Sequence, residues 1–195
     1  MPTNLDRVRA LDAQAVRLSR DLVRQSTVAD LHRPTPCAGW DLAELLGHMT
    51  AQHRGFAAAA RGAGAEAAAW AVVATATPVT AYEAAAEDVT AAFAHLTDAQ
   101  QGLVLPEFGT RTPFPAGQAI GFHLLDYLVH AWDVAATLDL PFDPGPDLPD
   151  AVLPLARAVP PASPAFAGAV PVPGDAGPLA RILGTLGRTP RPEDY

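Results

Sequence analysis

Apolar residues recur at helical spacing through most of the first 137 residues, whereas the remainder of the chain is dense in proline. In residues 4–25, apolar residues repeat every three or four positions with Asp and Arg between them. Most of the 20 prolines lie beyond residue 140, where they exclude long helices because proline lacks the amide N–H and clashes with the preceding turn. This contrast predicts a helical body, residues 1–140, and a Pro-rich extension, residues 141–195.

The helical body is predicted to be an all-α four-helix bundle, because it has four amphipathic segments and no strand-rich half. The expected helices span residues 4 to about 25, 41 to about 61, 77 to about 96, and 115 to about 137. Segment 63–76 is a connection of uncertain form, and segment 102–115 is expected to be extended, as a small hairpin or an irregular loop. In the extension, short helices are expected over 150–159 and 178–186, packed on the bundle and not forming an independent domain.

Composition excludes several classes of function. The net charge is −8 and the 13 basic residues, all Arg, are scattered singly, which argues against nucleic-acid and anionic-membrane partners. Cys37 is the only cysteine, so no intramolecular disulfide can form. The first twenty residues do not have the pattern of a signal peptide, and no apolar run approaches the roughly twenty residues that span a bilayer. We expect a soluble cytoplasmic protein, monomer or homodimer, that acts on a small molecule.

The run His123-Leu-Leu-Asp126-Tyr-Leu-Val-His130 indicates where function resides. Asp126 and His130 are four residues apart in a predicted helix, which places them on one face about 6 Å apart along the axis. Together with His48, from another helical segment, they can hold one divalent metal ion and leave coordination positions open, as catalysis requires. The alternative is a buried Asp–His pair that only rigidifies the bundle, because a buried carboxylate needs a partner.

Two more polar residues share this helix with the candidate ligands. His123 precedes Asp126 by three residues and His130 by seven, so it lies on the same face. It can be a fourth ligand, or a catalytic residue that contacts substrate one turn away. Asp133 follows His130 by three residues and can orient its imidazole as a hydrogen-bond acceptor.

The second predicted helix offers further candidates. His53 follows His48 by five residues, which rotates it about 140° away from the metal face. We therefore expect His53 not to bind the same metal but to reach substrate at the mouth of the bundle, as a second candidate catalytic residue. Gln52, four residues after His48, is the better-placed neighbour, whereas His32 and His95 are expected to be solvated.

Cys37 lies between Pro36 and the second predicted helix, about 16 Å from His48 along the axis. A helix N-terminus offers only part of the electropositive setting that a reactive thiol needs. We expect Cys37 to pack as a small apolar residue under Trp40.

Three motifs carry a resemblance to a known family: Pro34-Thr-Pro-Cys-Ala-Gly-Trp40, Leu45-Leu-Gly-His48-Met, and Leu124-Leu-Asp126-Tyr-Leu-Val-His130-Ala-Trp132-Asp133. In these segments the chain resembles mycothiol-dependent maleylpyruvate isomerase-type proteins, which belong to the DinB-like metal-binding bundles. The ending, Val170-Pro-Val-Pro with residues 179–188, is similar to a branch of metal-binding proteins within this group.

The resemblance implies a DinB-like fold and a metal, usually zinc with nickel as the alternative, held by His48, Asp126 and His130. Many members have Glu where this chain has Asp126. It also implies a low-molecular-weight thiol, mycothiol or a similar compound, as co-substrate. The isomerase carries a C-terminal domain for which the extension is too small, so the resemblance extends to the class of chemistry and not to maleylpyruvate itself.

The implied activity is S-transfer to a small electrophile or its cis–trans isomerisation, by a metal-activated thiol. A metal-bound water would instead make the protein a hydrolase, and a walled-in metal would favour a non-catalytic metal-binding or small-ligand-binding bundle. A nucleic-acid-processing role, suggested by the superfamily's DNA-damage name, conflicts with the net charge of −8.

Overall fold

The computed structural model describes residues 4–108, 112–161, 163 and 165–195. The chain divides into two compact units, Met1–Leu140 and Pro141–Tyr195. No helix in the described ranges is both long enough and apolar enough to cross a membrane.

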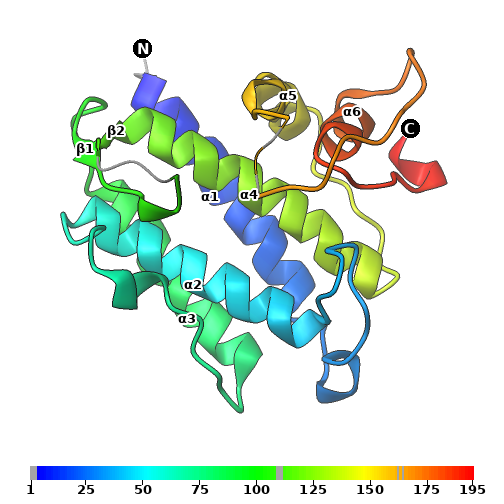
Figure 1. The fold of residues 1–195 in the computed structure, drawn as a ribbon, viewed down its shortest axis with the longest axis horizontal. Helices are drawn as coiled ribbons and strands as arrows, with labels where there is room; N and C mark the ends of the chain where they lie inside the picture. The colour runs from blue at the N-terminus through cyan, green and yellow to red at the C-terminus, as the bar shows by residue number, and fades with distance from the viewer. Residues whose placement is uncertain (1–3, 109–111, 162, 164) are drawn as a thin grey trace. The chain divides into compact units, whose positions relative to one another are not determined.

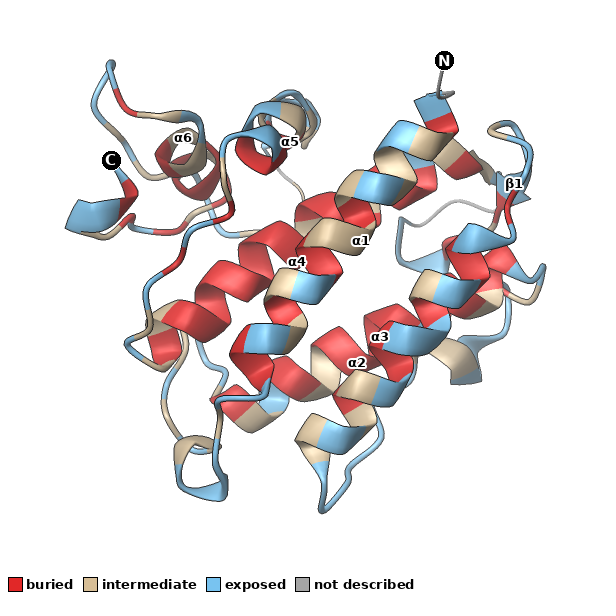
Figure 2. Cartoon of the chain, turned by 180° about the vertical axis from the view of Figure 1, so that it is seen from behind, coloured by how far each residue is buried: buried red, intermediate tan, exposed pale blue. Residues whose placement is uncertain are grey.

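The first unit is the predicted all-α four-helix bundle (Figure 1). Its long helices are α1 Asn4–Val23, α2 Leu42–Ala60, α3 Pro78–Ala94 and α4 Ala116–Thr137. α1 packs along α4 and α2 along α3, with further contacts between α1 and α3 and between α2 and α4. α4 is buried around most of its circumference (Figure 2). This agrees with its sequence, which is the most apolar among the predicted helices.

Local sequence signals explain where the helices begin and end. The Asp41 carboxylate accepts a hydrogen bond from the Glu44 amide, and the Glu44 carboxylate accepts one from the Asp41 amide, a capping box that starts α2. α3 begins at Pro78, whose missing N–H would be unsatisfied there in any case. α2 is followed by Gly62 at φ +87°, a conformation that favours glycine.

The connections between the long helices contain short regular elements. η1 Val28–Asp30 and η2 Ala67–Trp70 are single 3₁₀ turns. The predicted small hairpin is present as β1 Gly102–Leu103 paired antiparallel with β2 Phe114–Pro115, and η3 Pro106–Phe108 lies between these strands. Residues 109–111 of that predicted segment lie outside the described residues.

The second unit contains α5 Asp147–Ala158, α6 Pro178–Thr185 and the 3₁₀ turn η4 Pro192–Asp194. The two predicted short helices are therefore present, although α5 begins three residues earlier than expected and tolerates Pro154 inside it. α5 and α6 contact each other, and several of their apolar residues, among them Val152 and Ile182, are buried.

The buried face of α1 includes two polar residues. Asp12 and Ser19 are buried, whereas Leu11 and Leu18 are only partly buried. Both polar residues have partners in the interior, which explains why apolar periodicity alone does not indicate them. Ser19 Oγ lies 2.7 Å from the hydroxyl of Tyr82 on α3.

A tight contact joins α2 to the segment that follows it. The indole of Trp70 lies over Gly55, and its Nε1 donates a hydrogen bond of 2.8 Å to the Gly64 carbonyl. A Cβ atom at Gly55 would fall well inside the van der Waals radius of the indole. Glycine is therefore required at this position in spite of its low helix propensity.

We predict that Gly55→Ala displaces Trp70 and destabilises the bundle by about 1–3 kcal/mol, because overpacking outweighs the gain in helix propensity. Gly117→Ala is the matched control, since a Cβ on that α4 glycine meets nothing within 4 Å. Urea unfolding and Trp fluorescence report both effects. Equal stability of the two variants would contradict the prediction.

Candidate metal centre

The structure brings together the three residues that the sequence nominated as metal ligands. His48 projects from α2, and Asp126 and His130 from α4, so that one ligand atom from each lies within 4.8 Å of the others. His130 Nε2 is 3.3 Å from Asp126 Oδ1. The rings of His48 and His130 meet edge to face, with their centroids 5.2 Å apart.

His130 has a carboxylate beside each ring nitrogen. Its Nδ1 lies 2.9 Å from Asp133 Oδ2, the orienting contact expected from the sequence, and its Nε2 faces Asp126. Burial alone would lower the pKa of His130, but Asp126 and Asp133 raise it well above 6.5. Burial likewise opposes ionisation of Asp126, yet His130 and His48 bring its pKa down to about 2. Without a metal, a proton on His130 therefore holds the two carboxylates together.

The electrostatic surroundings of His48 differ from those of His130. Burial lowers its pKa, so the imidazole is neutral at pH 7 and available as a ligand. The ring of Trp40 covers one side of it, with the centroids 4.9 Å apart. Trp40 itself is 37% exposed and lies at the surface beside the centre.

The donor set fits a zinc-type ion. A tetrahedral ion bound at about 2.0–2.1 Å spaces its ligand atoms roughly 3.4 Å apart, and His130 and Asp126 already stand at 3.3 Å. Two imidazoles and one carboxylate leave at least one position open. The Asp126 side chain is 21% exposed, so this ligand lies near the surface of the bundle.

Cys37 lies closer to the candidate metal centre than its position in the sequence indicated. Its Sγ donates to Asp133 Oδ2 at 3.2 Å and lies 3.9 Å from His130 Nδ1, because segment 34–41 folds back over the end of α4. The estimate of about 16 Å along the helix axis assumed that the chain before α2 continues away from the centre, and it therefore missed this folding back. Cys37, His130 and Asp133 thus form a second group with ligand-atom spacing suited to a metal. We favour the first group, because hydrogen bonds already occupy Sγ, Nδ1 and Oδ2.

His123 and His53 belong to a buried polar chain and not to the bundle mouth. His123 Nδ1 lies 2.6 Å from Asp12 Oδ1, and its Nε2 lies 3.1 Å from His53 Nδ1. With both ring nitrogens engaged, His123 cannot be a fourth ligand as it stands. His53 is fully buried and stacked on Tyr127 at 3.9 Å, so its expected location at the mouth is wrong. Catalytic roles for these two histidines stay predictions.

The sequence contained a signal for Asp12 that apolar periodicity overlooked. Asp12 follows Leu5 by seven residues and precedes Ser19 by seven, which places all three on one face of α1. An acidic residue on the buried face needs a partner, and His123 supplies it.

The structure also adds Glu107, which the sequence analysis did not single out. Gln52 Nε2, one turn beyond His48 on α2, donates a 2.8 Å hydrogen bond to Glu107 Oε2. Loss of water around the carboxyl, together with the charge of Asp126, raises the pKa of Glu107 to about 7. No sequence motif predicts this, because Glu107 comes from the hairpin connection. His32 and His95 are exposed, as expected.

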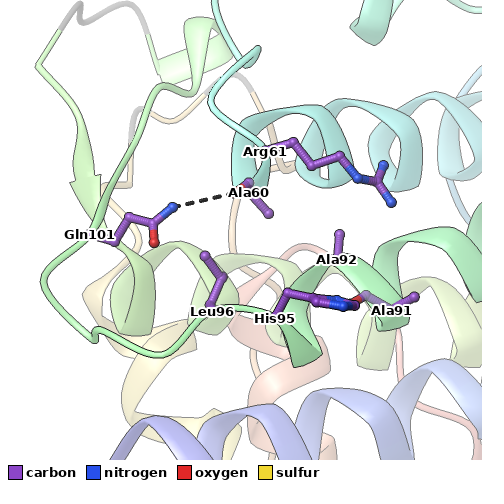
Figure 3. A pocket seen from close by; sticks show the side chains of 7 residues that line it. All are labelled: Ala60, Arg61, Ala91, Ala92, His95, Leu96 and Gln101. Atoms are coloured by element: carbon purple, nitrogen blue, oxygen red, sulfur yellow. Dashed lines mark hydrogen bonds between the residues drawn. The ribbon is translucent and has the colours of Figure 1, made fainter.

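A separate pocket lies at the other end of α2 (Figure 3). It is lined by residues from the ends of α2 and α3 and by Gln101, whose Nε2 donates to the Ala60 carbonyl at 3.3 Å. Arg61 at its rim is paired with Asp88 at 2.6 Å. Arg61 is thirteen residues from His48, about 20 Å along the helix, so this pocket is separate from the candidate metal centre.

The fold and the residues gathered between α2 and α4 define an all-α bundle of the DinB-like type. The family described as Mycothiol maleylpyruvate isomerase N-terminal domain matches residues 12–135, which confirms the resemblance drawn from the motifs. The chain belongs to this family.

Relatives are known for nearly the whole length of the chain. Uncharacterized proteins from two strains of Mycobacterium tuberculosis are each 31% identical over 196 residues, covering 94% of this chain and 96% of their own. The similarity thus extends through the Pro-rich unit, beyond the family match. No solved structure matches the chain significantly.

We predict that the metal-free protein loses stability as pH rises above neutrality. The raised pKa of His130 means that its stabilising charge is fully present below about 6.5 and is lost as pH rises through the folded-state pKa. Asp126→Asn removes one partner of the imidazolium and should move this decline to lower pH. Urea unfolding at a series of pH values, with metal chelated throughout, measures both curves. Superimposable curves would refute the assignment.

Proposed function

We propose that this protein holds a divalent ion, zinc by its donor set, at His48, Asp126 and His130. We further propose that it acts as an enzyme in which a low-molecular-weight thiol, mycothiol or a similar compound, is activated there. The reaction is S-transfer to a small electrophile or its cis–trans isomerisation. The observation that carries the proposal is the convergence of three ligand atoms within 4.8 Å on two facing helices. Membership of the family supports the thiol.

Each residue has a distinct task in this scheme. Asp133 holds His130 Nδ1, which directs Nε2 toward Asp126 and the ion. The lowered pKa of His48 keeps a lone pair available at neutral pH. The ion, when bound, would favour the thiolate form of the co-substrate and so make it a nucleophile. Trp40 beside His48 shields one flank of the centre from water.

The surroundings of the open position favour an enzyme over a passive metal-binding bundle. A structural ion would be closed in by apolar side chains, whereas here Asp126 is partly exposed. Gln52 and Glu107 add polar groups one helical turn away. Polar groups next to an open coordination position are what a reacting substrate requires.

We predict that the protein binds one zinc ion per chain and that His48→Ala and His130→Ala each weaken binding by about 100-fold or more, since a three-ligand site loses a third of its donors. His95→Ala is the control, because His95 is exposed at the C-cap of α3 and its side chain hydrogen-bonds only the Ala91 carbonyl among the contacts described. Zinc content and competition with a chromogenic chelator give the affinities.

The same variants should keep their helical circular dichroism, since the bundle core does not depend on the ion. Zinc bound equally well by His130→Ala would refute the site. Outright unfolding of that variant would make the ion structural and weaken the enzyme proposal.

We predict that Cys37→Ser retains zinc and leaves thiol-transfer activity within about threefold of wild type, because the Ser hydroxyl can still donate to Asp133. Consumption of cysteine, glutathione and mycothiol in the presence of an electrophile measures the activity. Thermal shifts with each thiol identify the preferred one. Loss of activity with zinc retained would show that the protein supplies its own nucleophile.

A further inference from the structure

The segment that carries Glu107 is fastened to both helices of the candidate metal centre. On α2, Glu107 Oε2 accepts a hydrogen bond from Gln52, four residues after His48. On α4, the ring of Phe108 stacks on Phe122, four residues before Asp126, with centroids 4.6 Å apart. Residues four apart lie on one face of a helix, about 6 Å along its axis.

These two attachments lie at the same level of the bundle. α2 and α4 run antiparallel here, since His48 meets His130 and, further along, His53 meets His123. A step forward on α2 and a step backward on α4 therefore lead in the same direction. η3 thus lies one turn from the candidate metal centre, with its carboxylate close enough to Asp126 for the two charges to interact.

The Glu107 carboxyl is placed to meet a substrate. The residue as a whole is exposed, while its carboxyl oxygen is held by Gln52. The charges acting on it come from Asp126 and His123 of α4, and the residue facing it from α2, Gln52, is neutral. A carboxyl that is held in place beside the candidate centre, and that has no cation paired to it among the described residues, is suited to exchange protons.

We propose that Glu107 is the catalytic acid–base of this centre, which takes the proton of the incoming thiol and returns it to the product. The inference rests on the proposed function. The substrate class it implies is an α,β-unsaturated carbonyl compound, which needs both a nucleophile and a proton. A pKa near 7 lets the carboxyl carry out both transfers at neutral pH.

The steps balance without any further reagent. The S–H bond of the thiol breaks and its proton moves to the Glu107 carboxylate. The sulfur lone pair forms a C–S bond at the β-carbon while the alkene electron pair moves toward the carbonyl. The α-carbon then takes the proton from the Glu107 carboxylic acid, which restores the carboxylate. In the isomerisation variant, the C–C bond rotates, the C–S bond breaks as the electron pair re-forms the alkene, and the departing thiolate takes its proton back from Glu107, which restores the carboxylate.

The test compares Glu107→Gln with wild type, using mycothiol and methyl vinyl ketone as substrates. We expect zinc content and the KM for thiol to be unchanged and kcat to fall by about 100-fold or more. Glu107→Asp should recover part of the rate, and Glu66→Gln, an exposed carboxylate remote from the centre, should have no effect. Loss of zinc in Glu107→Gln would overturn the role by making Glu107 a ligand.

A second readout does not depend on turnover. The side-chain carboxyl of Glu107, assigned by ¹³C NMR of the metal-free protein through its absence in Glu107→Gln, should titrate with a midpoint near 7. A midpoint near the ordinary value of about 4.3 would overturn the role. Equal turnover by wild type and Glu107→Gln would overturn this role alone. Absence of turnover in wild type would overturn the proposed function and this role with it.

Discussion

The imidazole of His130, with a carboxylate at each of its ring nitrogens, is the interaction around which the centre is organised. Asp133 holds the Nδ1 side of the ring and Asp126 faces the Nε2 side. The position between His130 Nε2 and Asp126 can be occupied either by a proton or by a metal ion. Metal binding must therefore release a proton, which links occupancy to pH. Cys37 and Trp40, both on segment 34–41, connect this interaction to the surface.

The sequence predicted the helices well because their signals are local. Amphipathic periodicity, the Asp41 capping box and the Thr77-Pro78 start act within a few residues, and the structure follows them. The three candidate ligands were also predicted correctly to be neighbours. For Asp126 and His130 the reason is local, because residues four apart on one helix lie on the same face.

What the sequence did not reveal depends on long-range contacts. Asp12 meets His123 across 111 residues, and Cys37 meets Asp133 across 96. Glu107 reaches Gln52 from a hairpin connection that has no periodicity of its own. Helical spacing fixes which residues of one helix share a face, but not which loop folds over that face.

The buried chain from Asp12 through His123 to His53 has a consequence for how the ligands stay aligned. It joins α1, α4 and α2 by two directional contacts, and Tyr127 of α4 adds a third by donating to the Met49 carbonyl of α2. Apolar faces can slide past one another at little cost, whereas a buried hydrogen bond is lost when a helix shifts by one turn, about 5.4 Å. α2 and α4 are thereby held in one longitudinal register. The residues of the candidate metal centre, near the ends of these helices, are thus aligned by contacts in the interior of the bundle.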